Sequence, residues 1–235
     1  MRLTAHRLAE LLKRKDWMES GRGMRFGLAG ILGVLLTAAW FWSPEPKDVR
    51  AANVFARSFS VGWVTDKPGD ACVVAFADLS LSSLRDFDVV CAGDKSLSQL
   101  VNFTDMKPET TYNLLVVDGI RFRLKALPRV TTLAIDEENP LPPNPAYGMV
   151  YDVNKKRAGG ALVYVYTVTG RPQYPIGVLA NEQGNYALDL SNLMIDGNSY
   201  VLVARKGADQ SAKIETDVRR TTPLPPIWLE RGGLE

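Results

Sequence analysis

The arrangement of hydrophobic and polar positions divides the chain into a helical part and a β-rich part. Residues 26–42 form an unbroken apolar run that contains no charged residue. After this run the pattern changes to short segments in which apolar and polar residues alternate, which is the period of a half-buried strand. Phe59, Val61 and Trp63, for example, share one face of a predicted strand. We therefore predict one helix followed by an all-β region.

The apolar run 26–42 is long enough to be a transmembrane helix. At ~1.5 Å per residue it covers roughly 26 Å, and the aromatic residues at its end suit the interface of a hydrocarbon core about 30 Å thick. Residues 1–25 form a basic head that the positive-inside rule keeps in the cytoplasm. We expect the N-terminus inside and the β region outside. Cleavage as a secretory signal is the alternative, but bulky aromatic residues follow the small-residue site 37–39, which favours a retained signal anchor.

The first outer segment, residues 43–128, contains about seven short predicted strands separated by turn signals, a pattern typical of an antiparallel sandwich. Its strongest local signal is a tyrosine corner, in which Pro108 and Thr110 precede Tyr112. In such a corner the ring fills the core and the hydroxyl bonds back to the main chain. Together with the strand 59–65 and its core tryptophan, these residues resemble a fibronectin type III domain. A similar domain precedes the catalytic domain of purple acid phosphatases.

The second outer segment, residues 147–229, again alternates with period two. Three short motifs, at 148–152, 160–163 and 182–188, resemble the carboxypeptidase regulatory-like family. This resemblance implies a prealbumin-like sandwich and is silent about activity, because such domains accompany many unrelated partners. By the same analogy, two such domains behind one anchor look like a surface protein of bacteria.

An acidic and proline-rich linker, residues 129–146, separates the two predicted domains, and residues 230–235 form a tail. Such a composition favours an extended, semi-rigid spacer, so we expect little contact between the domains. The predicted fold class is all-β: two tandem antiparallel β-sandwiches, fibronectin type III-like and then prealbumin-like, behind one N-terminal transmembrane helix.

The two cysteines of the chain, Cys72 and Cys91, both lie in predicted strands outside the membrane. A disulfide between them would close a loop of about twenty residues and contribute on the order of 3 kcal/mol to stability. An oxidising compartment favours the bond. Two buried free thiols are the alternative, since cysteine packs well as a small apolar residue.

The sequence offers little material for catalysis. The single histidine, His6, precedes the predicted span, so no histidine is available outside the membrane for a base-activated nucleophile or a zinc site. Two groups of carboxylates remain as candidates for acid–base chemistry, Asp86 with Asp88 and the run Asp136, Glu137 and Glu138, but charge runs are usually solvated surface. We expect no catalytic, cofactor-binding or metal-binding residues. The net charge of +2, concentrated in the head, indicates no nucleic-acid partner.

Aromatic side chains are the remaining candidates for a binding surface, because they dominate the energetics of interfaces. Five tyrosines in the second half qualify: Tyr147, Tyr151, Tyr164, Tyr166 and Tyr174. We expect most of them in the core and Tyr174, in a proline-flanked loop, to be exposed.

These observations favour a non-enzymatic, single-pass membrane protein. It would display two extracytoplasmic sandwiches for interaction with a protein or a glycan, or as a scaffold of the envelope. The alternative is a subunit of an envelope-spanning secretion or pilus-type assembly, whose basic head docks a cytoplasmic partner.

Overall fold

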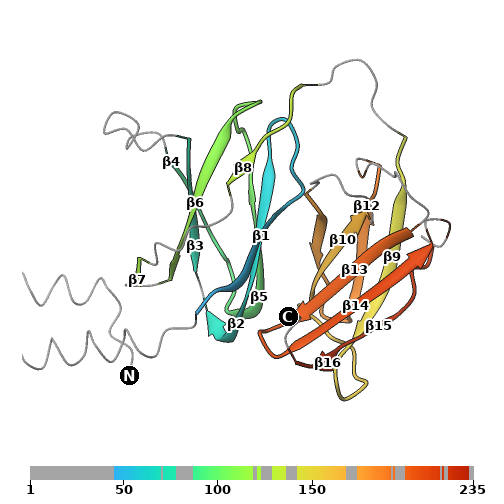
Figure 1. Cartoon of the computed structure of the whole chain (residues 1–235). Coiled ribbons are helices and arrows are strands. Elements are labelled where there is room, and N and C mark those ends of the chain that lie inside the picture. Colours follow the sequence, from blue (N-terminus) through green and yellow to red (C-terminus); the bar gives the residue numbers. More distant parts are fainter. Residues whose placement is uncertain are drawn as a thin grey trace, which may run out of the picture. The chain divides into compact units, whose positions relative to one another are not determined.

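The computed structural model in Figure 1 describes residues 45–69, 71–77, 87–118, 121–122, 129–135, 142–167, 174–191, 193, 199–217, 219 and 222–232. Every named element of this part is a strand, which confirms the predicted all-β class there. In the same residues, no helix is both long and apolar enough to cross a membrane. The predicted head and span, Asp86 and the acidic part of the linker lie outside the described residues.

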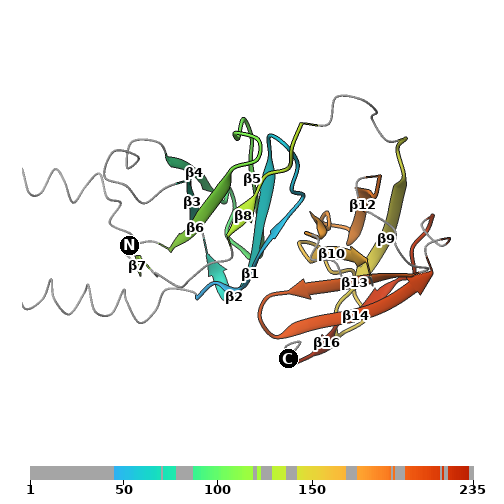
Figure 2. The same cartoon turned by 45° about the horizontal axis from the view of Figure 1, so that its top comes forward.

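The first sandwich consists of two antiparallel sheets (Figures 1 and 2). One sheet has the order β1-β2-β5 and contains β1 (Lys47–Ala52), β2 (Phe59–Gly69) and β5 (Ser96–Phe103). The other has the order β4-β3-β6-β7 and contains β3 (Cys72–Phe76), β4 (Phe87–Cys91), β6 (Thr111–Asp118) and β7 (Arg121–Phe122). A further strand, β8 (Val130–Thr131), also pairs with β6.

The core of the first sandwich is built on the alternation of β2. Phe59 and Trp63 are buried on its inner face, and the Phe59 ring lies against Phe103 and Tyr112 with ring centroids 4.8 Å and 5.7 Å apart. The Tyr112 hydroxyl accepts a hydrogen bond from the backbone N–H of Lys107 at 2.9 Å. The ring therefore fills the core while the hydroxyl holds the chain at the turn into β6.

Two further contacts stabilise this sandwich. In the turn before β6, the Thr110 hydroxyl donates to the carbonyl oxygen of Pro108 at 2.8 Å. Between β3 and β4, Cys72 and Cys91 face each other in register and form a disulfide. This bond ties the edge strand β4 to the sheet.

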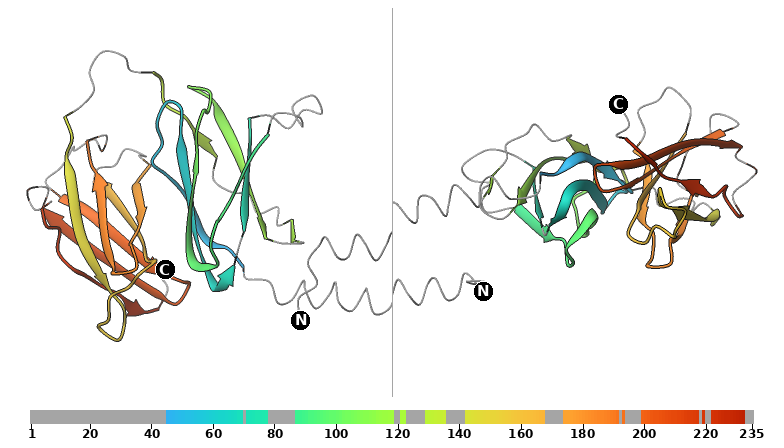
Figure 3. Two further views of the ribbon diagram at one scale, coloured as in Figure 1. Left: turned by 180° about the vertical axis from the view of Figure 1, so that it is seen from behind. Right: turned by 90° about the horizontal axis from the view of Figure 1, so that it is seen from below.

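The second sandwich also consists of two sheets, seen from behind and from below in Figure 3. The larger has the order β11-β10-β13-β14-β16 and contains β10 (Leu162–Thr167), β11 (Ile176–Leu179), β13 (Ser199–Lys206), β14 (Gln210–Asp217) and β16 (Glu230–Arg231). The smaller has the order β12-β9-β15 and contains β9 (Pro145–Tyr151), β12 (Asn185–Asp189) and β15 (Ile227–Trp228). Among the described strands, β15 and β9 form the one parallel pair.

The two sandwiches are joined by a shared hydrophobic cluster, so the expectation of little contact between them is wrong. Ala52 and Val64 of the first sandwich pack with Leu162, Tyr164 and Val203 of the second, and all five side chains are buried. The inner face of β10 belongs to the core of its own sandwich, and its outer face belongs to this cluster. Both faces of β10 are apolar because each is covered by a different neighbour.

Polar contacts close the same junction. Arg205 forms an ion pair with Asp48 at 2.6 Å, and Arg50 donates to the carboxylate of Asp48 and to the Tyr166 hydroxyl, each at 2.6 Å. The two sandwiches are thus held by buried apolar area and by charged groups that pair across the junction. Consistent with this, residues 43–235 cluster as one compact unit.

The side chain of Asn53 makes a further polar contact across the junction. Its amide nitrogen donates to the carbonyl oxygen of Gly177 and its amide oxygen accepts from the Gly177 backbone N–H, both at 2.8 Å. One side chain thereby satisfies both backbone groups of a residue in the other sandwich, as a neighbouring strand would.

Candidate binding groove on the second sandwich

The candidate site is a groove of about 670 Å³ formed by β9, β12 and β15 together with the segment 223–226. These strands make up the smaller sheet of the second sandwich, whereas the larger sheet contributes the contacts to the first sandwich. The groove therefore lies on the sheet that takes no part in the junction. Its volume is within the ~300–1,000 Å³ typical of small-molecule sites.

The alternation of β9 supplies the wall of the groove. Ala146 and Val150 point into the core of the second sandwich, while Tyr147, Met149 and Tyr151 alternate with them and line the groove. Because β9 is hydrogen-bonded to β12 on one side and to β15 on the other, this row of side chains is held on the central strand of its sheet.

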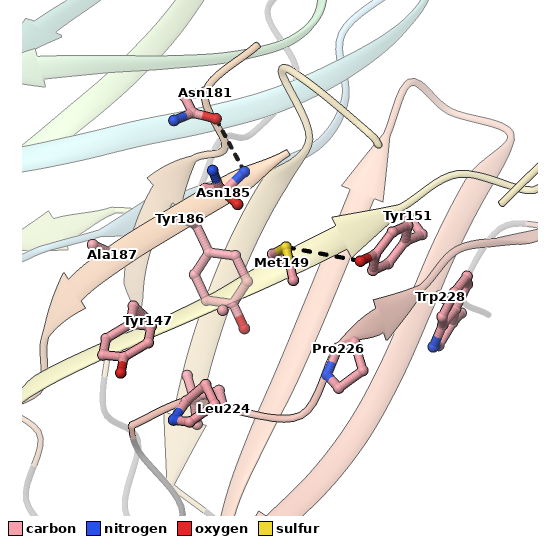
Figure 4. Close-up of a pocket in the computed structure, with 12 residues that line it drawn as sticks. Tyr147, Met149, Tyr151, Asn181, Asn185, Tyr186, Ala187, Leu224, Pro226 and Trp228 are labelled. Atoms are coloured by element: carbon pink, nitrogen blue, oxygen red, sulfur yellow. Dashed lines mark hydrogen bonds between the residues drawn. The ribbon is translucent and has the colours of Figure 1, made fainter. Parts of the chain in front are cut away.

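Trp228 extends the row onto the neighbouring strand. It pairs in parallel register with Tyr151, and the two rings stack with centroids 4.2 Å apart and planes inclined by 13°. Figure 4 shows Trp228 beside Tyr151, whose hydroxyl lies 3.8 Å from the sulfur of Met149. Trp228 remains 46% exposed and Tyr147 50% exposed, so large aromatic surfaces are open to solvent at both ends of the row.

Tyr186 of β12 also contributes to the lining, but its side chain is on the core-facing side of the strand, belongs to the core of the second sandwich and is 3% exposed. Its ring crosses Gly148 so closely that a Cβ at position 148 would overlap with it. Its hydroxyl has no hydrogen-bond partner among the described residues. Burial raises the pKa of the Tyr186 phenol, which keeps the hydroxyl protonated at neutral pH and able to donate a hydrogen bond.

The turn before β12 places amide groups at the rim. The side-chain oxygen of Asn181 accepts from the backbone N–H groups of Gln183 and Asn185, both at 3.0 Å, which fixes the turn. Gly184 sits in this turn with a φ of 73°, a conformation that favours glycine. The side-chain amide of Asn185 makes none of the hydrogen bonds found among the described residues and lines the groove.

The described residues that line the groove are all uncharged. They therefore offer no carboxylate pair for acid–base chemistry and no charge that would favour an ionic ligand. Across the part of the chain that the structure describes, no group of three or more His, Cys, Asp or Glu residues could hold a metal ion. What the groove offers is aromatic surface and a few neutral hydrogen-bonding groups.

The structure separates the five candidate tyrosines. Tyr147 and Tyr151 lie in the groove, whereas Tyr164 and Tyr166 belong to the junction between the sandwiches. Tyr174, which we expected to be exposed, has intermediate exposure. Its half-buried ring packs against the core of the first sandwich, and its hydroxyl accepts from the Thr131 backbone N–H at 3.2 Å. The contacts of Tyr174 come from the other sandwich, which a local pattern cannot show.

Sequence reasoning missed Trp228. It lies in a strand of two residues, too short for an alternating pattern, and its partner strand β9 is more than seventy residues earlier in the chain. The signal in the sequence was a tryptophan two residues after a pair of prolines, next to Ile227. The structure buries Ile227 and leaves Trp228 exposed. A tryptophan at such a position indicates an interaction surface more often than a core.

No family model matches the sequence, and no curated protein matches it at a significant level. Among solved structures, a segment of two fibronectin type III domains from chicken tenascin is 12% identical over 74% of this chain and 99% of that chain, with a TM-score of 0.28. BcpA, the major pilin subunit of Bacillus cereus, is 10% identical over 80% of this chain and 71% of that chain, with a TM-score of 0.28. PhoD is 11% identical over 44% of this chain and 21% of that chain, with a TM-score of 0.30. Likenesses of this size carry no argument about ligand, activity or partner.

Proposed function

We propose that this protein is a non-enzymatic, single-pass membrane protein that holds two joined sandwiches outside the cytoplasm and presents the groove of the second to a protein or glycan partner. The observation that carries the proposal is the groove itself. It combines exposed aromatic rings with neutral polar groups, and none of its described residues is charged. Such a surface binds, but it has no group suited to moving a proton or attacking a bond.

The junction between the sandwiches supports a display role. The buried cluster around Tyr164 and the ion pair between Asp48 and Arg205 fix the second sandwich on the first. A binding site on a fixed body loses less conformational freedom on binding than one on a flexible tether. The first sandwich then acts as a spacer that carries the groove away from the anchor.

The location rests on the sequence and on one bond. The apolar run 26–42 and the basic head favour an outward-facing body, and the disulfide between Cys72 and Cys91 fits an oxidising compartment, where such bonds persist.

Protease treatment of intact spheroplasts tests the location. We expect added protease to remove the body and to leave a small membrane-embedded fragment that contains residues 1–42, while a cytoplasmic marker stays intact. Lysed spheroplasts are the control in which the marker is also digested. Protection of the whole chain in intact spheroplasts would mean that the body faces the cytoplasm.

A further inference from the structure

We propose that the groove on β9, β12 and β15 is a site for a neutral glycan, that is, for an uncharged oligosaccharide of pyranose sugars. This inference rests on the proposed function, since it names the class of ligand that the displayed groove takes. It is carried by three features of the described residues: the stacked aromatic pair, the uncommitted polar groups and the absence of charge.

The aromatic pair suits the flat faces of sugar rings. One face of a pyranose carries several C–H groups and forms an apolar surface, which packs on an aromatic ring by burial and dispersion. Tyr151 supports the Trp228 ring at a centroid distance of 4.2 Å, while Trp228 stays 46% exposed. Tyr147, 50% exposed on the same strand as Tyr151, supplies a second platform. Two platforms along one groove match a ligand with more than one ring.

The polar groups suit sugar hydroxyls, which both donate and accept hydrogen bonds. The Asn185 amide has a donor and an acceptor, and a tyrosine hydroxyl can serve as either. Tyr147 and Tyr151 present their side chains on the groove side of β9, so their hydroxyls and the Asn185 amide are the polar groups that a sugar would meet.

The same features argue against a peptide. The backbone of β9 is already paired with β12 and β15, so an incoming segment has no free strand edge in the middle of the groove. A proline-rich segment could pack on the aromatic rings, but its prolines offer only carbonyl acceptors and would leave acceptors of the groove unpaired. Acidic glycans and phosphorylated ligands are disfavoured because no cation is found among the described residues that line the groove.

The test uses the full-length chain in detergent micelles on an array of neutral oligosaccharides of two to six glucose, galactose, mannose or N-acetylglucosamine units. The best ligand is then titrated by calorimetry. We expect binding that weakens at least tenfold in Trp228→Ala and in Tyr147→Ala, and less in Trp228→Phe. Phe87→Ala, which removes an aromatic side chain 51% exposed on the first sandwich, is the matched control and should bind like the wild type. Unchanged thermal unfolding of each variant excludes misfolding as the cause.

Three results would overturn the inference. They are no binding on the array, equal loss of binding in Phe87→Ala, and binding that survives both groove substitutions. A proline-rich peptide with the sequence of residues 139–146 is titrated in parallel, and its binding through Trp228 without any glycan binding would assign the groove to polypeptide instead. The spheroplast experiment tests only the location of the body. If protease removes the body but no glycan binds, the glycan inference is wrong and the proposed function is not contradicted.

Discussion

Gly62 of β2 and Tyr164 of β10 fit together across the junction between the two sandwiches: a Cβ at position 62 would overlap with the Tyr164 hydroxyl. Because glycine has no side chain, it leaves space on the outer face of β2, and the Tyr164 side chain occupies this space. The close approach of the two sheets therefore depends on the absence of one methyl group.

Adding that methyl group should loosen the junction. We expect Gly62→Ala to lower the free energy of unfolding by about 1–3 kcal/mol, because overpacking at a buried contact forces shifts of its neighbours. Urea denaturation followed by tryptophan fluorescence measures the effect. Gly93→Ala, with nothing within 4 Å of the added Cβ, is the control and should change little. Equal midpoints for the two variants would show that the sandwiches do not approach closely at position 62.

The ion pair between Asp48 and Arg205 should matter more than the exposed pair between Lys47 and Asp66. The Arg205 side chain is 8% exposed, so Asp48→Asn leaves a buried charge without its counter-charge, a change that typically costs 3–5 kcal/mol. Arg50 also loses its carboxylate partner in this variant. Asp66→Asn breaks a pair whose side chains are 47% and 52% exposed, and it should cost less than about 1 kcal/mol. Chemical denaturation of both variants decides the point, and similar losses would contradict burial at the junction.

Tyr112 should stabilise both sandwiches, although it lies in the first. Tyr112→Phe removes the hydrogen bond with Lys107 and should cost about 1–3 kcal/mol, whereas Tyr112→Ala also opens a cavity and should cost about 3–5 kcal/mol. Since the sandwiches share a buried cluster, we expect one calorimetric transition that moves to lower temperature in both variants. Two transitions, of which only one moves, would mean that the sandwiches unfold independently.

Alkaline pH should destabilise the protein through its buried tyrosines. Burial raises the pKa values of Tyr164 and Tyr186 above the usual value of 10.0, so the folded state keeps protons that the unfolded chain has lost. This contribution is complete below about pH 10, the unfolded value, and declines as the pH rises above it. Urea midpoints measured between pH 8 and 11 should fall at the alkaline end. Tyr164→Phe should flatten the decline, and an unchanged slope in this variant would contradict the prediction.

The sequence alone determined the features that depend on residues close together in the chain. Alternation with period two placed Phe59 and Trp63 on an inner face, and the spacing from Pro108 to Tyr112 located the turn whose hydroxyl bonds back to the main chain. These features were readable because each depends on residues close together in the chain, for which burial of one face leaves a regular signature.

Only the tertiary structure decided what covers each apolar face. The two apolar faces of β10 fit its interior place in the order β11-β10-β13-β14-β16, but only the structure shows that its outer face is covered by the first sandwich. The same holds for Tyr174, whose half-buried ring packs against the core of the first sandwich. The groove is a further case, because its residues come from β9, β12 and the 223–228 segment. Alternation of apolar and polar residues along a strand indicates that one face is apolar. It does not indicate which distant segment covers that face, because this depends on the long-range packing of whole sheets.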